Sequence, residues 1–288
     1  MPDFPIFDAH VHLYDPSAVA YPWMAGVPAL NTPHLPDRFV QSLGGVEVEG
    51  LVFVEVDAGP GAHMDEARFI SGLRAENPLI RGMVASMPLE DGPEAVAADL
   101  AAWAAKPGAR GVRRLIQAHA DEPGWSIREP FVEAVRSLAA HDLSFDLCLF
   151  HPQMKDATAL VRACPDVRFV LDHIGKPGIR DGLTDPWRDD IAALAREPNV
   201  WCKISGVVTE ADHAAWTADQ VAPYIAHAIS SFGYQRSMFG GDWPVSTLAT
   251  TYRGWVDVVD AVVAGATAEE RQRLFRGTAL EFYRLDRD

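Results

Sequence analysis

The stretch Phe7-Asp8-Ala9-His10-Val11-His12 decides the fold. It continues a short apolar lead, Phe4-Pro5-Ile6, that is typical of a β-strand. Because alternate side chains of a strand project to the same face, His10 and His12 should point the same way at the end of this strand. Two imidazoles that converge on one point can bind a metal ion or make polar contacts with a substrate. The competing interpretation is a chance pair on a solvated strand face.

Seven further apolar strands are predicted after this one, at residues 50–56, 80–86, 111–117, 143–151, 167–173, 200–205 and 237–242. Helices are predicted between and after them, at residues 63–76, 93–105, 129–141, 155–163, 187–196, 213–232, 252–263 and 268–275. Nearly continuous apolar strands that alternate with helices indicate a parallel sheet that is covered on both faces. Eight such units in 288 residues predict an α/β fold, a (β/α)₈ TIM barrel that spans residues 1–288 as one domain.

An open doubly wound sheet is the alternative fold. It usually has a glycine-rich phosphate loop after its first strand, and here that place holds His10, His12 and then Leu-Tyr-Asp-Pro. No GxGxxG motif or P-loop occurs in the chain, so nucleotide binding is disfavoured. The proline-rich residues 13–38 show no periodicity and are expected to form a loop, either a wall of the active site or a surface segment that packs down.

The chain carries a formal net charge of −15, from 40 acidic and 25 basic residues. This balance argues against nucleic acid or an anionic membrane as a partner, and a small-molecule substrate is expected instead. The oligomeric state stays open, with a homo-oligomer among the options. No signal peptide or transmembrane stretch is visible, and Cys148, Cys164 and Cys202 form no CxxC pair. We therefore expect a cytoplasmic enzyme, with Cys148 and Cys202 as buried structural thiols.

Polar side chains close nearly every predicted strand. In barrel enzymes the chemistry lies at the carboxyl ends of the strands, and burying polar groups there costs free energy unless they are paired. The candidate site residues from these ends are His10, His12, Glu55, Arg113, Gln117, His151, His173, Lys203, Ser205 and Asp242.

Each of these residues also has a structural interpretation. His173 could be a hydrogen-bonded core histidine, Asp242 could cap a turn, and His151 could be a loop residue. Glu55 and Gln117 could support other site residues without touching a substrate. Asp8 and Asp172 are interpreted as outward-facing or supporting groups and not as metal ligands.

Six segments spread over the chain are recognisable motifs: residues 7–12 (FDAHVH), 21–23 (YPW), 110–113 (RGVR), 169–177 (FVLDHIGKP), 202–206 (CKISG) and 238–244 (MFGGDWP). With them the sequence resembles the amidohydrolase superfamily. Within it, the sequence resembles the amidohydrolase-related lactonases, the group that acts on 2-pyrone-4,6-dicarboxylate, L-fuconolactone and L-rhamnonolactone. The last two motifs before Met238, FVLDHIGKP and CKISG, are the more specific to the lactonase group.

The resemblance implies a (β/α)₈ hydrolase in which Asp242 transfers protons and Arg113 contacts an anionic or polar edge of the substrate. Binuclear members of the superfamily bridge two metals with a carboxylated lysine on strand four. Strand four here offers Arg113 and Arg114, so we expect at most one divalent metal, zinc, held by His10, His12, His173 and Asp242. The group also includes a metal-free case, in which the same histidines hold the substrate.

The mechanism expected from these residues is hydrolysis of a lactone, a cyclic ester. Asp242 would accept a proton from water, and His173 or the zinc would orient the carbonyl group. Arg113 and Lys203 would stabilise the oxyanion or a substrate carboxylate. The further substrate contacts are expected from Glu55, Gln117, His151 and Ser205, and from the aromatic Tyr21, Trp23 and Trp243 around a sugar-like ring. The alternatives are a metal-dependent decarboxylase of a ring carboxylate and a non-catalytic barrel that binds a sugar acid.

Overall fold

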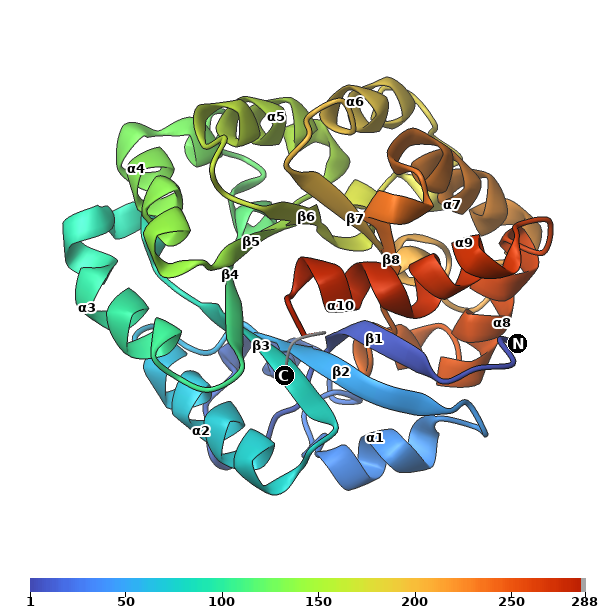
Figure 1. The fold of residues 1–288 in the computed structure, drawn as a ribbon, viewed down its shortest axis with the longest axis horizontal. Helices are drawn as coiled ribbons and strands as arrows, with labels where there is room; N and C mark the ends of the chain where they lie inside the picture. Colours follow the sequence, from blue (N-terminus) through green and yellow to red (C-terminus); the bar gives the residue numbers. More distant parts are fainter. Residues whose placement is uncertain (286–288) are drawn as a thin grey trace.

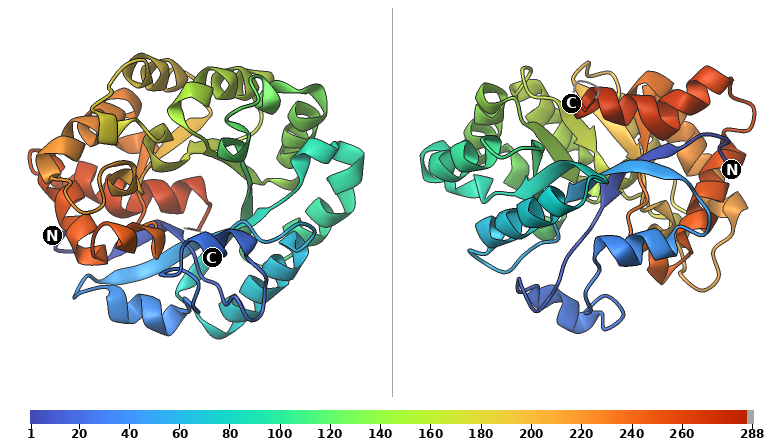
Figure 2. Two further views of the ribbon diagram at one scale, coloured as in Figure 1. Left: turned by 180° about the vertical axis from the view of Figure 1, so that it is seen from behind. Right: turned by 60° about the horizontal axis from the view of Figure 1, so that its bottom comes forward.

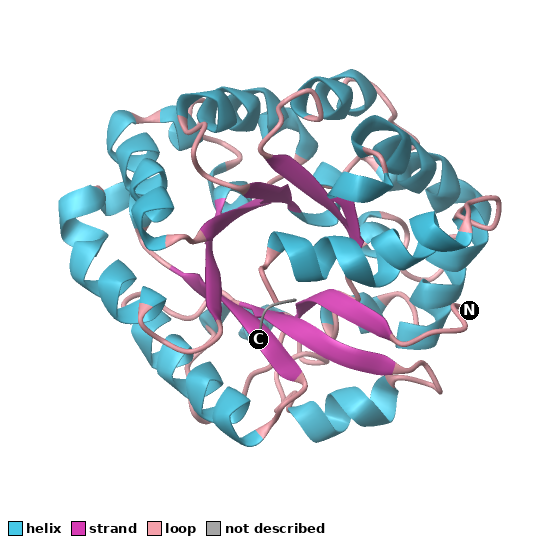
Figure 3. Cartoon of the chain, viewed as in Figure 1, coloured by secondary structure: helices cyan, strands magenta, loops and turns pink. Residues whose placement is uncertain are grey.

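Eight parallel strands, each hydrogen-bonded to its neighbours in chain order, form the inner barrel of the molecule (Figure 3). The computed structural model describes residues 1–285. This arrangement confirms the (β/α)₈ TIM barrel. The strands are β1 (Ile6–Val11), β2 (Val48–Val54), β3 (Ile80–Ser86), β4 (Ala109–Leu115), β5 (Ser144–Cys148), β6 (Phe169–Leu171), β7 (Val200–Ile204) and β8 (Ser237–Phe239).

Helices surround the strands on the outside (Figure 1). A π-helical turn, Arg273–Gly277, joins the last two of them. The helices are α1 (Pro36–Ser42), α2 (His63–Glu76), α3 (Pro93–Ala104), α4 (Glu129–Ser137), α5 (Met154–Ala163), α6 (Trp187–Leu194), α7 (Ala218–Phe232), α8 (Tyr252–Val262), α9 (Ala268–Gln272) and α10 (Thr278–Phe282).

The barrel closes between β8 and β1 through the segment that follows β8. The amide of Asp242 donates to the carbonyl of His10 (2.8 Å), and the amide of His12 donates to the carbonyl of Trp243 (2.7 Å). Val11 and Trp243 form a parallel bridge between these two bonds. Closure therefore places the predicted histidine pair directly beside the predicted proton-transfer residue.

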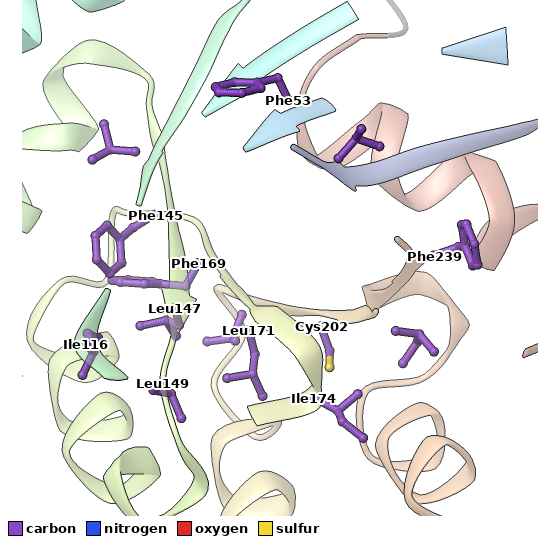
Figure 4. Close-up of a cluster of buried hydrophobic side chains, with 14 of the residues drawn as sticks. Phe53, Ile116, Phe145, Leu147, Leu149, Phe169, Leu171, Ile174, Cys202 and Phe239 are labelled. Atoms are coloured by element: carbon purple, nitrogen blue, oxygen red, sulfur yellow. The ribbon is translucent and has the colours of Figure 1, made fainter. Parts of the chain in front are cut away.

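Two separate sets of apolar side chains hold the fold together. The larger set lies between the strands and the outer helices, and Figure 4 shows part of it, with Phe145 and Leu147 of β5 beside Phe169 and Leu171 of β6. The smaller set includes Phe7 and side chains of β2, β3 and α10. Helix α10 lies across the barrel (Figure 1), and the segment between β1 and α1 extends on the opposite side (Figure 2, right).

Three helical details differ from the sequence prediction. Helix α7 begins at Ala218 and not at residue 213, because the hydroxyl of Thr217 accepts the amide hydrogen of Gln220 and caps the helix there. Helix α1 begins inside the segment that was predicted as a loop, with a proline at its first position. Helix α10 was not predicted either, since five residues are too few to show a helical period.

A search of residues 1–285 finds no helix that combines the length and the apolar character required to span a bilayer.

Candidate active site at the carboxyl end of the barrel

Three imidazoles and one carboxylate meet where the barrel closes. The distance to Oδ1 of Asp242 is 3.4 Å from Nε2 of His12, 3.7 Å from Nε2 of His10 and 4.0 Å from Nε2 of His173. The Nε2 atoms of His10 and His12 are 3.3 Å apart. All four side chains are buried. The structure therefore brings together the four residues that the sequence proposed as metal ligands.

An irregularity in β1 separates the roles of Asp8 and His10. Asp8 pairs with Leu51 and Val11 pairs with Phe53, so β1 advances by three residues where β2 advances by two. This one-residue shift turns Asp8 away from His10, although the two residues have the same parity in the sequence. The Asp8 carboxylate instead accepts hydrogen bonds from the Tyr252 hydroxyl (2.9 Å) and from the amides of Gly241 and His10. Asp8 thus ties β1 to the segment after β8.

A left-handed turn after β6 places His173. Four consecutive residues have positive φ: His173 (53°), Ile174 (49°), Gly175 (73°) and Lys176 (47°). This conformation costs roughly 1–2 kcal/mol for each residue that has a Cβ. The indole of Trp187 donates to the carbonyl of Ile174 (2.7 Å) and helps to hold the turn.

Hydrogen bonds at Nδ1 set the orientation of the imidazoles. The Nδ1 of His12 lies 2.8 Å from the carbonyl oxygen of Val54, which can only accept, so Nδ1 of this ring donates a proton to that carbonyl. The Nδ1 of His173 lies 3.0 Å from Oγ of Ser205. Burial lowers the pKa of His173 to about 4 and also lowers the pKa of His10, so both rings are neutral at neutral pH.

The donor set fits one divalent metal ion. Burial opposes ionisation of Asp242, but the imidazoles of His173, His12 and His10 hold the pKa of its carboxyl well below the usual range. Nε2 of His12 and Oδ1 of Asp242 lie 3.4 Å apart, close enough for both atoms to bind the same cation together with His10. Imidazole nitrogen with carboxylate oxygen is the ligand chemistry that zinc favours. A second geometric group, His10 with His173 and Asp172, overlaps this one.

Arg113 lies inside the barrel, but its charge is already matched. Its Nε donates to Oε1 of Glu55 (2.5 Å), its Nη2 to the backbone carbonyl of Glu55 (2.6 Å), and its Nη1 to Oδ2 of Asp172 (3.2 Å). Burial opposes the charge, but the Glu55 carboxylate and the other neighbouring groups hold the pKa of Arg113 above its usual value. Glu55 is 1% exposed and binds Arg113, so its carboxylate does not face the cavity described below.

Lys203 lies beneath the histidines. Its side chain is fully buried, and its Nζ lies 2.5 Å from Oδ2 of Asp146, 3.0 Å from Oδ1 of Asp172 and 3.1 Å from Nδ1 of His10. Burial opposes this charge too, but the two carboxylates raise the pKa of Lys203. Asp172 was expected to face outward or to support its neighbours, and it lies in the barrel interior, where it bridges Lys203 and Arg113.

A cavity of about 320 Å³ opens above these groups. Of the predicted site residues, its wall contains His12, Trp23, Arg113, Gln117, His173 and Asp242. The remaining predicted residues lie elsewhere. His10, Glu55, Lys203 and Ser205 are buried behind the wall, Tyr21 and Trp243 are buried in the apolar core, and His151 lines an adjacent hollow of about 730 Å³.

The cavity wall also contains polar side chains that the sequence analysis did not propose. Lys176 and Thr209 line both the cavity and the adjacent hollow, and Asp57 and Cys148 line the cavity alone. Lys176 stands inside the FVLDHIGKP motif, and Asp57 directly follows the predicted second strand, so signals for both were present. Burial raises the pKa of the Cys148 thiol to about 11, which leaves it protonated and poorly nucleophilic.

Comparisons with known proteins identify relatives of the whole chain. A model of the amidohydrolase family matches residues 7–285. An L-fucono-1,5-lactonase of Burkholderia multivorans is 32% identical to this chain, over 96% of this chain and 95% of that protein. A crystal structure of an amidohydrolase from Burkholderia multivorans with bound zinc shares the fold at a TM-score of 0.88 and 31% identity, covering 98% and 99% of the two chains.

A more distant neighbour shares only the fold. A dihydroxybenzoic acid decarboxylase from a Polaromonas species, solved with bound manganese, has a TM-score of 0.68 at 15% identity and covers 99% of this chain and 98% of its own. The family match, in contrast, extends from the first residues of β1 to the last described residue. The chain belongs to the amidohydrolase family.

Proposed function

We propose that this protein hydrolyses a small sugar lactone or a related carboxylated lactone. The observation that carries the proposal is the ionised Asp242 carboxylate among three imidazoles at the floor of a cavity of about 320 Å³. The L-fucono-1,5-lactonase that is 32% identical over nearly the full length supports a cyclic ester as the substrate.

The reaction uses the groups of the cavity floor in sequence. A zinc ion held by His10, His12, His173 and Asp242 would supply a Lewis acid and lower the pKa of a bound water. Asp242 accepts a proton as the water oxygen adds to the carbonyl carbon, and the carbonyl π pair moves onto the carbonyl oxygen. The ring C–O bond then breaks, and Asp242 returns the proton to the departing ring oxygen. The product is one open-chain hydroxy acid.

The remaining cavity wall suits a compact ring with polar substituents. The indole of Trp23 is 36% exposed, and its Nε1 donates to the carbonyl of Val56 (2.8 Å), which fixes the ring as a wall. Leu115 and Val245 supply apolar surface, while the amide of Gln117 can bind a hydroxyl group.

The decarboxylase alternative is not favoured by any contact in this site, and the likeness to the Polaromonas enzyme extends to the fold alone. For the location of the enzyme we propose the cytoplasm, supported by the three buried cysteines, all of which are free thiols.

The test is a panel of sugar 1,5- and 1,4-lactones in a pH-indicator assay, because ring opening releases a carboxylic acid. The wild type should release protons from at least one lactone, and Asp242→Asn should lower the rate on the order of a hundredfold or more. Asp121→Asn, in an exposed loop, is the matched control and should keep full activity. Running each assay with and without a chelator measures the requirement for the metal. A wild type inert on the whole panel, or a fully active Asp242→Asn, would contradict the proposal.

A further inference from the structure

The charged groups around the cavity are unequally compensated. Arg113 and Lys203 were expected to stabilise the oxyanion or a substrate carboxylate, but each already pairs with two carboxylates. Lys203 is also fully buried behind His10 and does not reach the cavity wall. Neither side chain therefore offers an uncompensated positive charge to a substrate.

Lys176 differs from both in its partners. Its Nζ donates to Oε1 of the neutral amide Gln117 (2.5 Å), and the nearest carboxylate oxygen in a described ion pair, Oε1 of Glu210, is 4.0 Å away. The ammonium also lies 5.3 Å from the centroid of the Phe150 ring, which limits its freedom to swing outward. Lys176 is thus a cavity cation held by a neutral group, with its charge only weakly matched.

The backbone presents this ammonium together with His173. Both residues belong to the left-handed turn of four positive-φ residues, and both line the cavity whose floor is Asp242. A lysine and an isoleucine in this conformation are costly, and such backbone outliers are found at functional sites more often than elsewhere. The turn orients Lys176 toward the same space as the water-activating carboxylate.

We propose that Lys176 is a catalytic residue whose ammonium binds the lactone carbonyl oxygen and stabilises the oxyanion that forms when water adds. This inference rests on the proposed lactonase function. The lysine keeps its proton throughout: the negative charge that develops on the carbonyl oxygen is held by the ammonium and disappears when the ring C–O bond breaks. A preorganised donor of this kind acts on the transition state more than on the bound substrate.

The primary test compares Lys176→Met with wild type on a lactone that the wild type hydrolyses. Methionine matches the length of the lysine stem and removes the charge. The kcat value should fall on the order of 10²- to 10³-fold while KM changes less than about threefold. Lys176→Arg, which keeps the charge, should recover part of the loss. Lys155→Met, on the exposed face of α5, is the matched control and should behave as wild type.

A second variant tests the charge without removing the lysine. Gln117→Glu places a carboxylate where the amide oxygen now lies, so that Lys176 becomes neutralised in the way that Glu55 neutralises Arg113. Its kcat should fall at least tenfold further than that of Gln117→Met, which removes the amide and leaves the charge. Circular dichroism and the thermal midpoint check that each variant is folded.

Each outcome bears on a distinct claim. A Lys176→Met enzyme within threefold of wild type, a loss confined to KM, or equal kcat values for the two Gln117 variants would overturn the role of Lys176 and leave the lactonase function standing. A wild type that hydrolyses no lactone would overturn the proposed function and this inference with it.

Discussion

Individual charges in this barrel are stabilised by specific partners, and the partners decide what each residue can do. Asp172 forms an ion pair with Lys203 through Oδ1 and with Arg113 through Oδ2, so two cations share one carboxylate inside the barrel. Buried charges of this kind persist only when they are paired and hydrogen-bonded. Lys203 contacts Nδ1 of His10, and Nε2 of the same ring lies near Asp242. Asp242 itself is in no described ion pair with a lysine or an arginine.

One buried carboxyl away from this cluster makes stability depend on pH. Burial and the charge of Glu55 raise the pKa of Glu66 to about 8 from the ordinary 4.5. The folded protein therefore keeps this proton up to about pH 8, whereas the unfolded chain releases it near pH 4.5. The stabilisation is fully present below pH 4.5 and is lost as the pH rises through about 8.

Glu66→Gln should remove this dependence, because an amide does not titrate. Between pH 5 and 9 the free energy of unfolding of wild type should fall relative to that of the variant, by on the order of a few kcal/mol in total. Urea midpoints at unit pH intervals measure the difference. Parallel curves for the two proteins would show that Glu66 ionises normally in the folded state.

At the residue scale the sequence could predict which polar side chains gather, but not how they pair. His10 lies on β1, and His12, His173 and Asp242 lie one, two and three residues after the ends of β1, β6 and β8, and that pattern alone brings them to one end of a barrel. The partners of Arg113 depend on the depth of each side chain along its strand, which the sequence pattern does not give. Lys203 is one layer too deep for a substrate contact, and Tyr21 is packed into the core.

At the scale of elements, the loops after β6 and β7 meet at His173 of the candidate site. Gly206, after β7, has a φ of 59°, and a Cβ at this position would lie 2.4 Å from Nδ1 of His173 and 2.8 Å from Oδ2 of Asp242. Only a glycine lets the β7 loop approach both side chains this closely. The glycine is therefore part of the support of the site.

Gly206→Ala should push His173 out of place and lower kcat/KM on the order of a hundredfold, since a displacement near 1 Å can cost that much. Gly182→Ala is a matched control: Gly182 also has a positive φ (66°), but no atom lies within 4 Å of its added Cβ. Both variants should lose similar stability from backbone strain, and only Gly206→Ala should lose activity. Equal activities would mean that His173 can shift without consequence.

Element boundaries were predictable where apolar periodicity continues to the end of an element. Helix α2 and strand β3 begin and end at the predicted residues. Strand β6 ends at Leu171, two residues before the predicted end, because the turn that carries His173 leaves the strand geometry at this point. That turn has no pattern that predicts it, since its φ values are unfavourable for histidine, isoleucine and lysine alike.

At the scale of the whole molecule, a hydrogen bond connects the residue that follows helix α10 to the barrel interior beneath the candidate site. The hydroxyl of Tyr283, just after α10, donates to Oδ2 of Asp146 (3.1 Å), and Asp146 in turn binds Lys203 (2.5 Å). The barrel itself follows from eight repeated units, but this contact joins residues 137 positions apart in the sequence. No local pattern could have predicted it.

Tyr283→Phe removes this hydroxyl and leaves the Asp146 carboxylate with one donor fewer. A hydrogen bond to a charged group contributes roughly 1.5–3 kcal/mol, so the free energy of unfolding in urea should fall by about that amount. Tyr224→Phe is the matched control, because the Tyr224 hydroxyl donates to a neutral carbonyl, that of Leu183 (3.1 Å), and its loss should cost only about 0.5–1.5 kcal/mol. If both variants lost the same stability, the Asp146 carboxylate beneath the site would be stabilised by Lys203 without a contribution from Tyr283.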